Sequence, residues 1–127
     1  MSGAKEQKVL VVDDDPDITM TLGIYLEGKG YRAASAANGQ EALDAVRRQR
    51  VDLVLLDLMM PVLDGFETLK RLQGDPATAA IPVFAISGKY LDAEMHARMM
   101  GESNVKAYFM KPLLLSNLGQ RVAQVLG

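Results

Sequence analysis

The sequence contains no cysteine, which excludes a disulfide framework, a thiolate metal site and a cysteine nucleophile. It also has no apolar run near the ~20 residues that a membrane-spanning helix needs, and it opens with MSGAKEQK, which lacks the apolar core of a signal peptide. A basic excess is missing as well, since 14 Lys and Arg stand against 16 Asp and Glu. These absences disfavour direct nucleic-acid binding through a broad basic face and predict a cytoplasmic protein with no membrane contact.

Five short β-type runs are present and alternate with segments in which apolar residues recur at helical spacing. With 127 residues, 49% of them apolar, the chain has the size of one domain, which we expect over residues 8–127 after a flexible stretch at 1–7. The first, third and fourth runs are almost continuously apolar, as in strands buried on both faces, whereas the Ala-rich second run is expected at a sheet edge. The runs are Lys8–Val12, Tyr31–Ala36, Asp52–Leu56, Pro82–Ile86 and Lys106–Met110.

The intervening segments carry helix start signals. Asp15 precedes Pro16, and Asn38 and Asp64 are each followed three residues later by a glutamate. A fourth helix is expected from about Asp92 to Met100, and a fifth carries Leu115, Leu118, Val122 and Val125. The fifth also contains Gly119, which costs ~1 kcal/mol relative to Ala inside a helix. Strict strand–helix alternation predicts an α/β fold of (βα)5 type, an open parallel sheet with helices on both faces.

Polar side chains follow the expected strands at their carboxyl ends, where open parallel sheets bind ligands. Asp57 directly follows an apolar run, so its carboxylate is expected to be partly buried. It then needs a compensating partner, because burial of an unpaired charge is unfavourable. The residues that converge there from four elements are Asp13, Asp14 and Asp15, then Asp57, then Ser87 and Gly88, and finally Lys111 and Pro112.

The chemistry of this set favours a divalent cation and a phosphoryl group. Mg²⁺ prefers oxygen ligands and commonly takes one or two carboxylates and a phosphate oxygen. A carboxylate such as Asp57 can then act as nucleophile toward phosphorus and form an aspartyl phosphate. The Lys111 ammonium would neutralise the transferred oxygens, and the Ser87 hydroxyl would donate to one of them.

The sequence resembles a response-regulator receiver domain of two-component signalling, of the single-domain type found in chemotaxis regulators. The resemblance runs from Lys8 to Leu126 and implies a flavodoxin-like three-layer sandwich with strand order 2-1-3-4-5. Four segments in the family's order carry it: VLVVDDDPDI (9–18), DLVLLDLMMPVLDG (52–65), ISG (86–88) and KP (111–112).

The resemblance also implies roles for individual residues. The Mg²⁺ ligands would be Asp13, Asp14, the phosphoacceptor Asp57 and the backbone carbonyl of Met59. Lys111 would bind the phosphoryl group, Ser87 and Tyr108 would form the switch, and Met59 and Lys89 would tune the lifetime of the phosphate. The sequence departs from the family's common pattern at Leu113, at Leu114 and in a longer stretch over 101–108, all outside the acidic pocket.

The function that the resemblance implies is a phosphorylation-activated switch. A sensor histidine kinase or phosphotransfer protein would donate to Asp57, and the domain would catalyse its own phosphorylation and dephosphorylation. The signal would pass through the surface formed by the fourth helix, fifth strand and fifth helix to a downstream protein or an output domain outside this chain.

Three alternatives stay open. The first is a pseudo-receiver that binds partners without phosphorylation. The second is an aspartate-nucleophile phosphatase, which needs a second carboxylate at the position of Met59. A nucleotide-binding module is the least favoured, because neither GxGxxG nor a P-loop pattern occurs. His96, the only histidine, is interpreted as a surface or packing residue and not as a phosphoryl relay.

Overall fold

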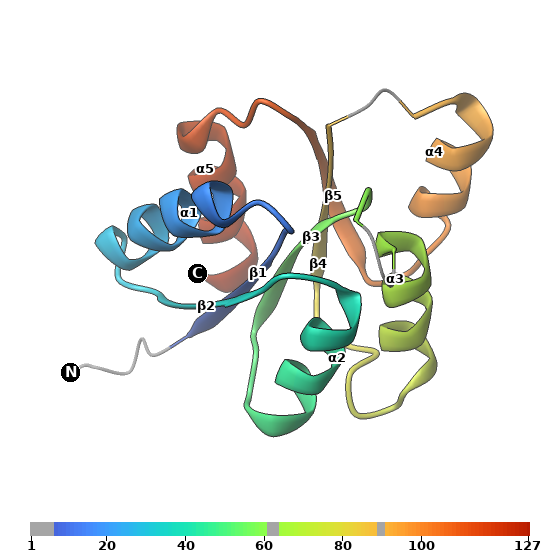
Figure 1. The fold of residues 1–127 in the computed structure, drawn as a ribbon, viewed down its shortest axis with the longest axis horizontal. Helices are drawn as coiled ribbons and strands as arrows, with labels where there is room; N and C mark the ends of the chain where they lie inside the picture. Colours follow the sequence, from blue (N-terminus) through green and yellow to red (C-terminus); the bar gives the residue numbers. More distant parts are fainter. Residues whose placement is uncertain (1–6, 61–63, 89–90) are drawn as a thin grey trace.

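Strands and helices alternate along the whole chain in the computed structural model, which describes residues 7–60, 64–88 and 91–127 (Figure 1). The flexible stretch predicted at 1–7 therefore lies almost wholly outside the described residues. The elements are β1 (Lys8–Val12), α1 (Pro16–Gly28), β2 (Arg32–Ala36), α2 (Gly39–Arg48), β3 (Leu53–Asp57), α3 (Gly65–Gly74), β4 (Val83–Ser87), α4 (Ala93–Met100), β5 (Val105–Met110) and α5 (Leu115–Leu126).

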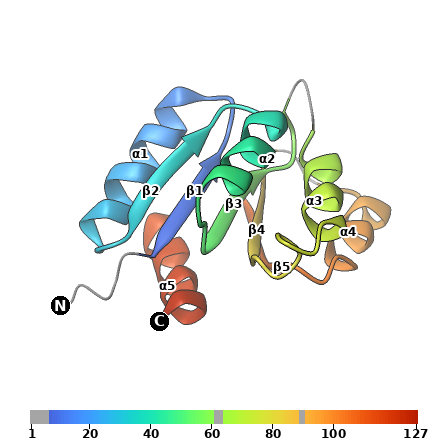
Figure 2. The ribbon, with the colours of Figure 1, turned by 90° about the horizontal axis from the view of Figure 1, so that it is seen from below.

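The five strands form one parallel sheet in the order β2-β1-β3-β4-β5. Helices α1 and α5 cover one face and α2, α3 and α4 cover the other, so the molecule has three layers (Figures 1 and 2). The predicted flavodoxin-like fold is thus confirmed, with the Ala-rich β2 at an edge. None of the helices in the described part of the chain has the length and apolar character that crossing a membrane demands.

Two separate apolar cores lie on the two faces of this sheet. Successive side chains of a strand point to opposite faces, so Val9 and Val11 of β1 join one core while Leu10 and Val12 join the other. The first core is completed by residues such as Leu22, Leu26, Leu118 and Val122 from α1 and α5. The second is completed by residues such as Leu43, Leu69, Leu72 and Met99 from α2, α3 and α4.

The predicted bounds of two strands were wrong by one residue at each end. The sequence predicted strands over Asp52–Leu56 and Pro82–Ile86, but β3 runs over Leu53–Asp57 and β4 over Val83–Ser87. Asp57 pairs with Ile86, and Ser87 pairs with Met110, so both polar residues still belong to the sheet. Hydrogen bonding between backbones extended each strand past the point where the apolar run stops.

The pairing of the last strand with β4 contains an irregularity. Val83 pairs with Val105, whereas the next residue, Phe84, pairs with Ala107, so Lys106 is an extra residue on β5. The strand therefore begins one residue before the predicted Lys106. Likewise β2 begins at Arg32, one residue after the predicted start.

Side-chain caps begin four of the five helices. The carboxylates of Asp15, Asp64 and Asp92 and the amide oxygen of Asn38 each accept a hydrogen bond from a backbone N–H in the first helical turn. The predicted caps at Asp15, Asn38 and Asp64 are therefore confirmed. Leu114 caps α5 with no side-chain hydrogen bond, as its apolar side chain requires.

Gly119 has a packing reason to stand inside α5. A Cβ atom at this position would overlap the hydroxyl of Tyr25 on α1 and would lie 3.1 Å from the ring carbon that bears it. The missing side chain therefore lets α1 and α5 approach each other. This contact compensates for the low helix propensity of glycine.

Candidate functional site

Three carboxylates meet at the carboxyl ends of β1 and β3. One oxygen each from Asp13, Asp14 and Asp57 lies within 4.8 Å of the others. Asp13 and Asp57 are only 4% and 3% exposed, whereas Asp14 faces solvent. The group therefore has two fixed, buried members and one member that is open to incoming ions.

Lys111 supplies the compensating charge. Its Nζ lies 2.8 Å from Asp13 Oδ2 and 3.3 Å from Asp57 Oδ2. The backbone N–H of Lys111 donates to the carbonyl of Ser87 at 2.8 Å, which fixes the start of the side chain at the end of β4. One ammonium thus holds two buried carboxylates that would otherwise repel each other.

Backbone N–H groups orient the same two carboxylates. Met59 donates to Asp57 Oδ1 at 3.0 Å, and Asp15 donates to Asp13 Oδ1 at 2.9 Å. Each buried carboxylate therefore has one oxygen held by the backbone and the other held by Lys111. The two side chains are fixed before any ligand arrives.

Gly65, the first residue of α3, packs directly on the backbone that follows Asp57. A Cβ atom there would overlap the Cα of Leu58 and lie 2.6 Å from the carbonyl oxygen of Asp57. The N–H of Gly65 also donates to the carbonyl of Leu58 at 3.1 Å. Only glycine allows α3 to come this close to the segment that carries the Met59 N–H.

Burial raises the pKa of the Asp57 carboxyl above 3.8. The Met59 N–H works against this shift, the negative charge of Asp13 adds to it, and Lys111 again lowers it. Burial alone would lower the pKa of the Lys111 ammonium, but its hydrogen bond to Asp13 and the charges of both aspartates raise that pKa above 10.5. Lys111 is therefore charged at neutral pH, and Asp57 keeps its proton to higher pH than a free aspartate does.

Two further residues of interest lie on β4 and β5. Ser87 is fully buried at the end of β4. Tyr108 is half-buried on β5 opposite Ala85, and its ring lies edge-on to that of His96 on α4.

Comparison with known proteins shows which family has this sequence and fold. Residues 9–123 match the family model of the response regulator receiver domain. The chain belongs to the response regulator receiver domain family. The family functions in two-component systems, in which phosphorylation switches the regulator.

Relatives of this receiver domain include longer regulators. The DNA-binding response regulator MtrA of Mycolicibacterium smegmatis is 38% identical over 116 residues, which is 91% of this chain and 49% of that protein. The transcriptional regulatory protein AfsQ1 of Streptomyces coelicolor is 33% identical over 93% of this chain and 50% of its own length. The chain thus spans about half the length of these relatives.

Solved receiver structures share the fold over nearly the whole chain. The response regulator receiver protein from Pseudomonas putida gives a TM-score of 0.89 at 29% identity and covers 95% of this chain and 98% of its own. The chemotaxis protein CheY4 of Vibrio cholerae gives 0.86 at 27% identity and covers 95% and 99%.

The receiver domain brings together four of the residues singled out in the sequence, namely Asp13, Asp14, Asp57 and Lys111. Ser87 adjoins them through the backbone of Lys111, and Met59 contributes its N–H. The predicted use of the Met59 carbonyl stays a prediction, and Lys89 lies outside the described residues. The ion pair of Lys111 with Asp13 and the Met59 N–H went unpredicted, because no side-chain pattern signals either of them.

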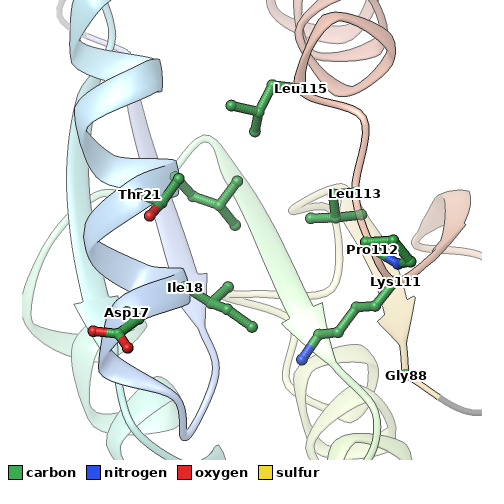
Figure 3. Close-up of a pocket in the computed structure, with 9 residues that line it drawn as sticks. Asp17, Ile18, Thr21, Gly88, Lys111, Pro112, Leu113 and Leu115 are labelled. Carbon is green, nitrogen blue, oxygen red and sulfur yellow. The ribbon is translucent and has the colours of Figure 1, made fainter.

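A pocket of about 620 Å³ opens beside the alkyl chain of Lys111 in the receiver domain (Figure 3). It lies between α1 and the connection from β5 to α5. Ile18 faces Leu113 across the gap, whereas the carboxylate of Asp17 points away from it. The walls are therefore mainly apolar, and the polar chemistry stays at the Lys111 end.

The raised pKa of Asp57 predicts a pH-dependent stability. The folded chain holds this proton more tightly than the unfolded chain does, so the free energy of unfolding falls as pH rises from 3.8 through the folded-state pKa. With divalent ions chelated, Asp57→Asn should be more stable than wild type at neutral pH, and the difference should shrink below pH 3.8. Urea unfolding at both pH values measures this, and a less stable variant at neutral pH would contradict it.

Proposed function

We propose that this chain accepts a phosphoryl group on Asp57 and acts as a phosphorylation-driven switch. The observation that carries the proposal is the pairing of a buried, backbone-oriented Asp57 with the Lys111 ammonium, next to two further carboxylates. Among the described residues, Asp57 Oδ2 is held only by the Lys111 ammonium, which can release it by turning to incoming phosphoryl oxygens, so this oxygen suits attack on phosphorus. A pseudo-receiver would have no use for the complete set.

The donor set also fits Mg²⁺, since three carboxylates within 4.8 Å are hard oxygen ligands with excess negative charge. Asp13, Asp14, Asp57 and the Met59 carbonyl would hold the ion. When bound, Mg²⁺ supplies positive charge that stabilises the phosphoryl oxygens during transfer.

Transfer forms an oxygen–phosphorus bond from a carboxylate oxygen of Asp57 and breaks the nitrogen–phosphorus bond of a phosphohistidine, whose imidazole leaves with the electron pair. The Lys111 ammonium moves from the carboxylates to the phosphoryl oxygens and neutralises them. Water later hydrolyses the acyl phosphate and restores the carboxylate of Asp57. We expect Met59 and Lys89 to tune the lifetime of the phosphate.

The same site suits a protein as the donor of the phosphoryl group. We expect a sensor histidine kinase or phosphotransfer protein as donor, with the exchange taking place in the cytoplasm. Residues 8–127 form the receiver unit, and a downstream protein or an output domain reads the α4, β5 and α5 surface. An aspartate-nucleophile phosphatase is disfavoured, since Met59 stands where the second carboxylate would be needed.

Mg²⁺ should raise the melting temperature of wild type, because it binds the folded chain and not the unfolded chain. The gain depends on how far the Mg²⁺ concentration exceeds the dissociation constant, and it is about 2.7 kcal/mol at a hundredfold excess. Asp14→Ala should lose most of this gain while keeping or raising its stability without metal, since an exposed like charge is removed. Asp92→Ala, which removes an exposed helix cap, serves as the control. Thermal melts with chelator and with millimolar Mg²⁺ test this, and an unchanged wild-type curve would contradict the metal site.

The switch itself is tested at Ser87. The phosphoryl group would draw the Ser87 hydroxyl toward it and free space for Tyr108, which shifts the population of the α4–β5 region. With beryllium fluoride and Mg²⁺, hydrogen exchange over residues 91–100 and 106–115 should change in wild type and change little in Ser87→Ala. Ser35→Ala, on the edge strand, should respond like wild type. An identical response in Ser87→Ala would show that its hydroxyl is not the transmitting contact.

A further inference from the structure

Tyr108 packs against the only histidine in the chain. The ring centroids of His96 and Tyr108 lie 5.7 Å apart and the ring planes meet at 85°, which is an edge-to-face pair. Aromatic pairs in this geometry are favourable beyond the area that they bury. The pair joins α4 to β5, so it stabilises the position that Tyr108 occupies in this structure.

The hydroxyl of Tyr108 makes the opposite contribution. It is buried, and among the described residues it finds no hydrogen-bond partner. A buried hydroxyl without a partner destabilises the arrangement that holds it. The ring also borders a cavity of about 420 Å³ that Leu91, Ala93 and Met110 help to line. Tyr108 thus has one favourable contact, one unfavourable group and space in which to move.

The position of Ser87 defines where the ring would go. Tyr108 pairs with Ala85 on β4, and Ala85 and Ser87 share a face of the sheet because they are two residues apart. That face carries α4, since Ala85 belongs to the same apolar core as Met99. A ring that moves toward Ser87 therefore travels along this face of the sheet.

We propose that His96 is a positioning residue for the switch, which holds the Tyr108 ring beneath α4 and opposes its displacement toward Ser87. The inference rests on the proposed function, because the proposed switch requires the Tyr108 ring to move toward Ser87 and His96 would restrain that movement. The ring contact favours the position that Tyr108 occupies here, and the unpaired hydroxyl disfavours it. Removing either one should therefore shift the population between the two ring positions, in opposite directions.

The test is a titration of the labelled protein with beryllium fluoride at fixed Mg²⁺, followed through the backbone amide resonances of Gly88 and Lys111. His96→Ala should lower the concentration for half-maximal response about 2- to 10-fold, the range expected for the loss of one aromatic pair. His96→Phe keeps an aromatic edge and should restore the wild-type midpoint. Glu94→Ala, an exposed change in the first turn of the same helix, is the matched control.

Tyr108→Phe should shift the midpoint in the opposite direction. It keeps the ring contact and removes the unpaired hydroxyl, so the midpoint should rise roughly fivefold or more. In wild type, the ring resonances of His96, the only histidine of the sequence, should also move as beryllium fluoride binds, because the neighbouring ring departs. A purely structural role for His96 predicts neither the movement of its ring resonances nor the opposite shifts of the midpoint in His96→Ala and Tyr108→Phe.

The outcomes separate the two proposals. A wild-type protein whose Gly88 and Lys111 amides do not respond would overturn the proposed function. A normal wild-type response with an unchanged midpoint in His96→Ala would overturn the role of His96 alone. An equal lowering by Glu94→Ala would also overturn it, since the effect would then belong to the helix and not to the ring contact.

Discussion

Asp57→Asn should take up no phosphoryl group above background when incubated with Mg²⁺ and acetyl phosphate, whereas wild type should gain one group. The amide is isosteric with the carboxylate and can still accept from the Met59 N–H, but its oxygen is a far weaker nucleophile toward phosphorus. Intact-mass analysis measures the uptake.

The matched control for this experiment is Asp64→Asn, the same chemical change at an exposed helix cap. It should label like wild type. The modified wild-type protein should lose its added mass in base and keep it in acid, as an acyl phosphate does. Equal labelling of wild type and Asp57→Asn would assign the phosphoryl group to another residue and remove the basis of the proposed switch.

Gly65→Ala should lower the free energy of unfolding by about 2–3 kcal/mol, the range for overpacking a site that cannot relax cheaply. The added Cβ meets the backbone of Leu58 and the carbonyl of Asp57, and backbone atoms cannot rotate away as a flexible side chain can. Relief requires α3 to move back from β3, which would also displace the Met59 N–H from Asp57. Urea unfolding measures the stability, and the rate of labelling by acetyl phosphate measures the displacement.

Gly74→Ala is the natural control, since it makes the same change at the other end of α3, where a Cβ meets nothing within 4 Å. It should alter stability by no more than about 1 kcal/mol, and in the stabilising direction expected from helix propensity. If both alanine variants behaved alike, the close approach of Gly65 to the backbone would have no energetic weight.

The parts of this molecule that the sequence predicted are those that depend on local chemistry. Short β-type runs between segments of helical spacing predicted each strand. Asp15, Asn38 and Asp64 predicted three helix starts, because a cap is a contact within one turn. Asp57 stood out because it ends a run of Val and Leu. The convergence of Asp13, Asp57 and Lys111 followed from the rule that parallel strands end at one edge of the sheet.

The parts that escaped prediction depend on contacts between distant residues. The extra residue Lys106 arises from pairing between β4 and β5, and nothing in either strand alone specifies it. Gly119 has a low helix propensity, and only the close contact with Tyr25 of α1 explains why glycine stands there. The interpretation of His96 as a surface or packing residue agrees with its exposed place on α4, but its ring contact with Tyr108 joins two elements that only the fold brings together.

The two apolar cores on opposite faces of the sheet have a consequence for how such a protein diversifies. Val9 and Leu10 are chain neighbours, yet they pack into different cores. Substitutions that repack α4 against one face therefore have no direct contact with the side chains beneath α1 and α5, and energetic effects at separated sites are close to additive. A lineage can therefore repack α4 on its core while the core beneath α1 and α5 keeps its shape. Because the proposed output surface takes α4 from one core and α5 from the other, one half of that surface can change while the other half stays fixed.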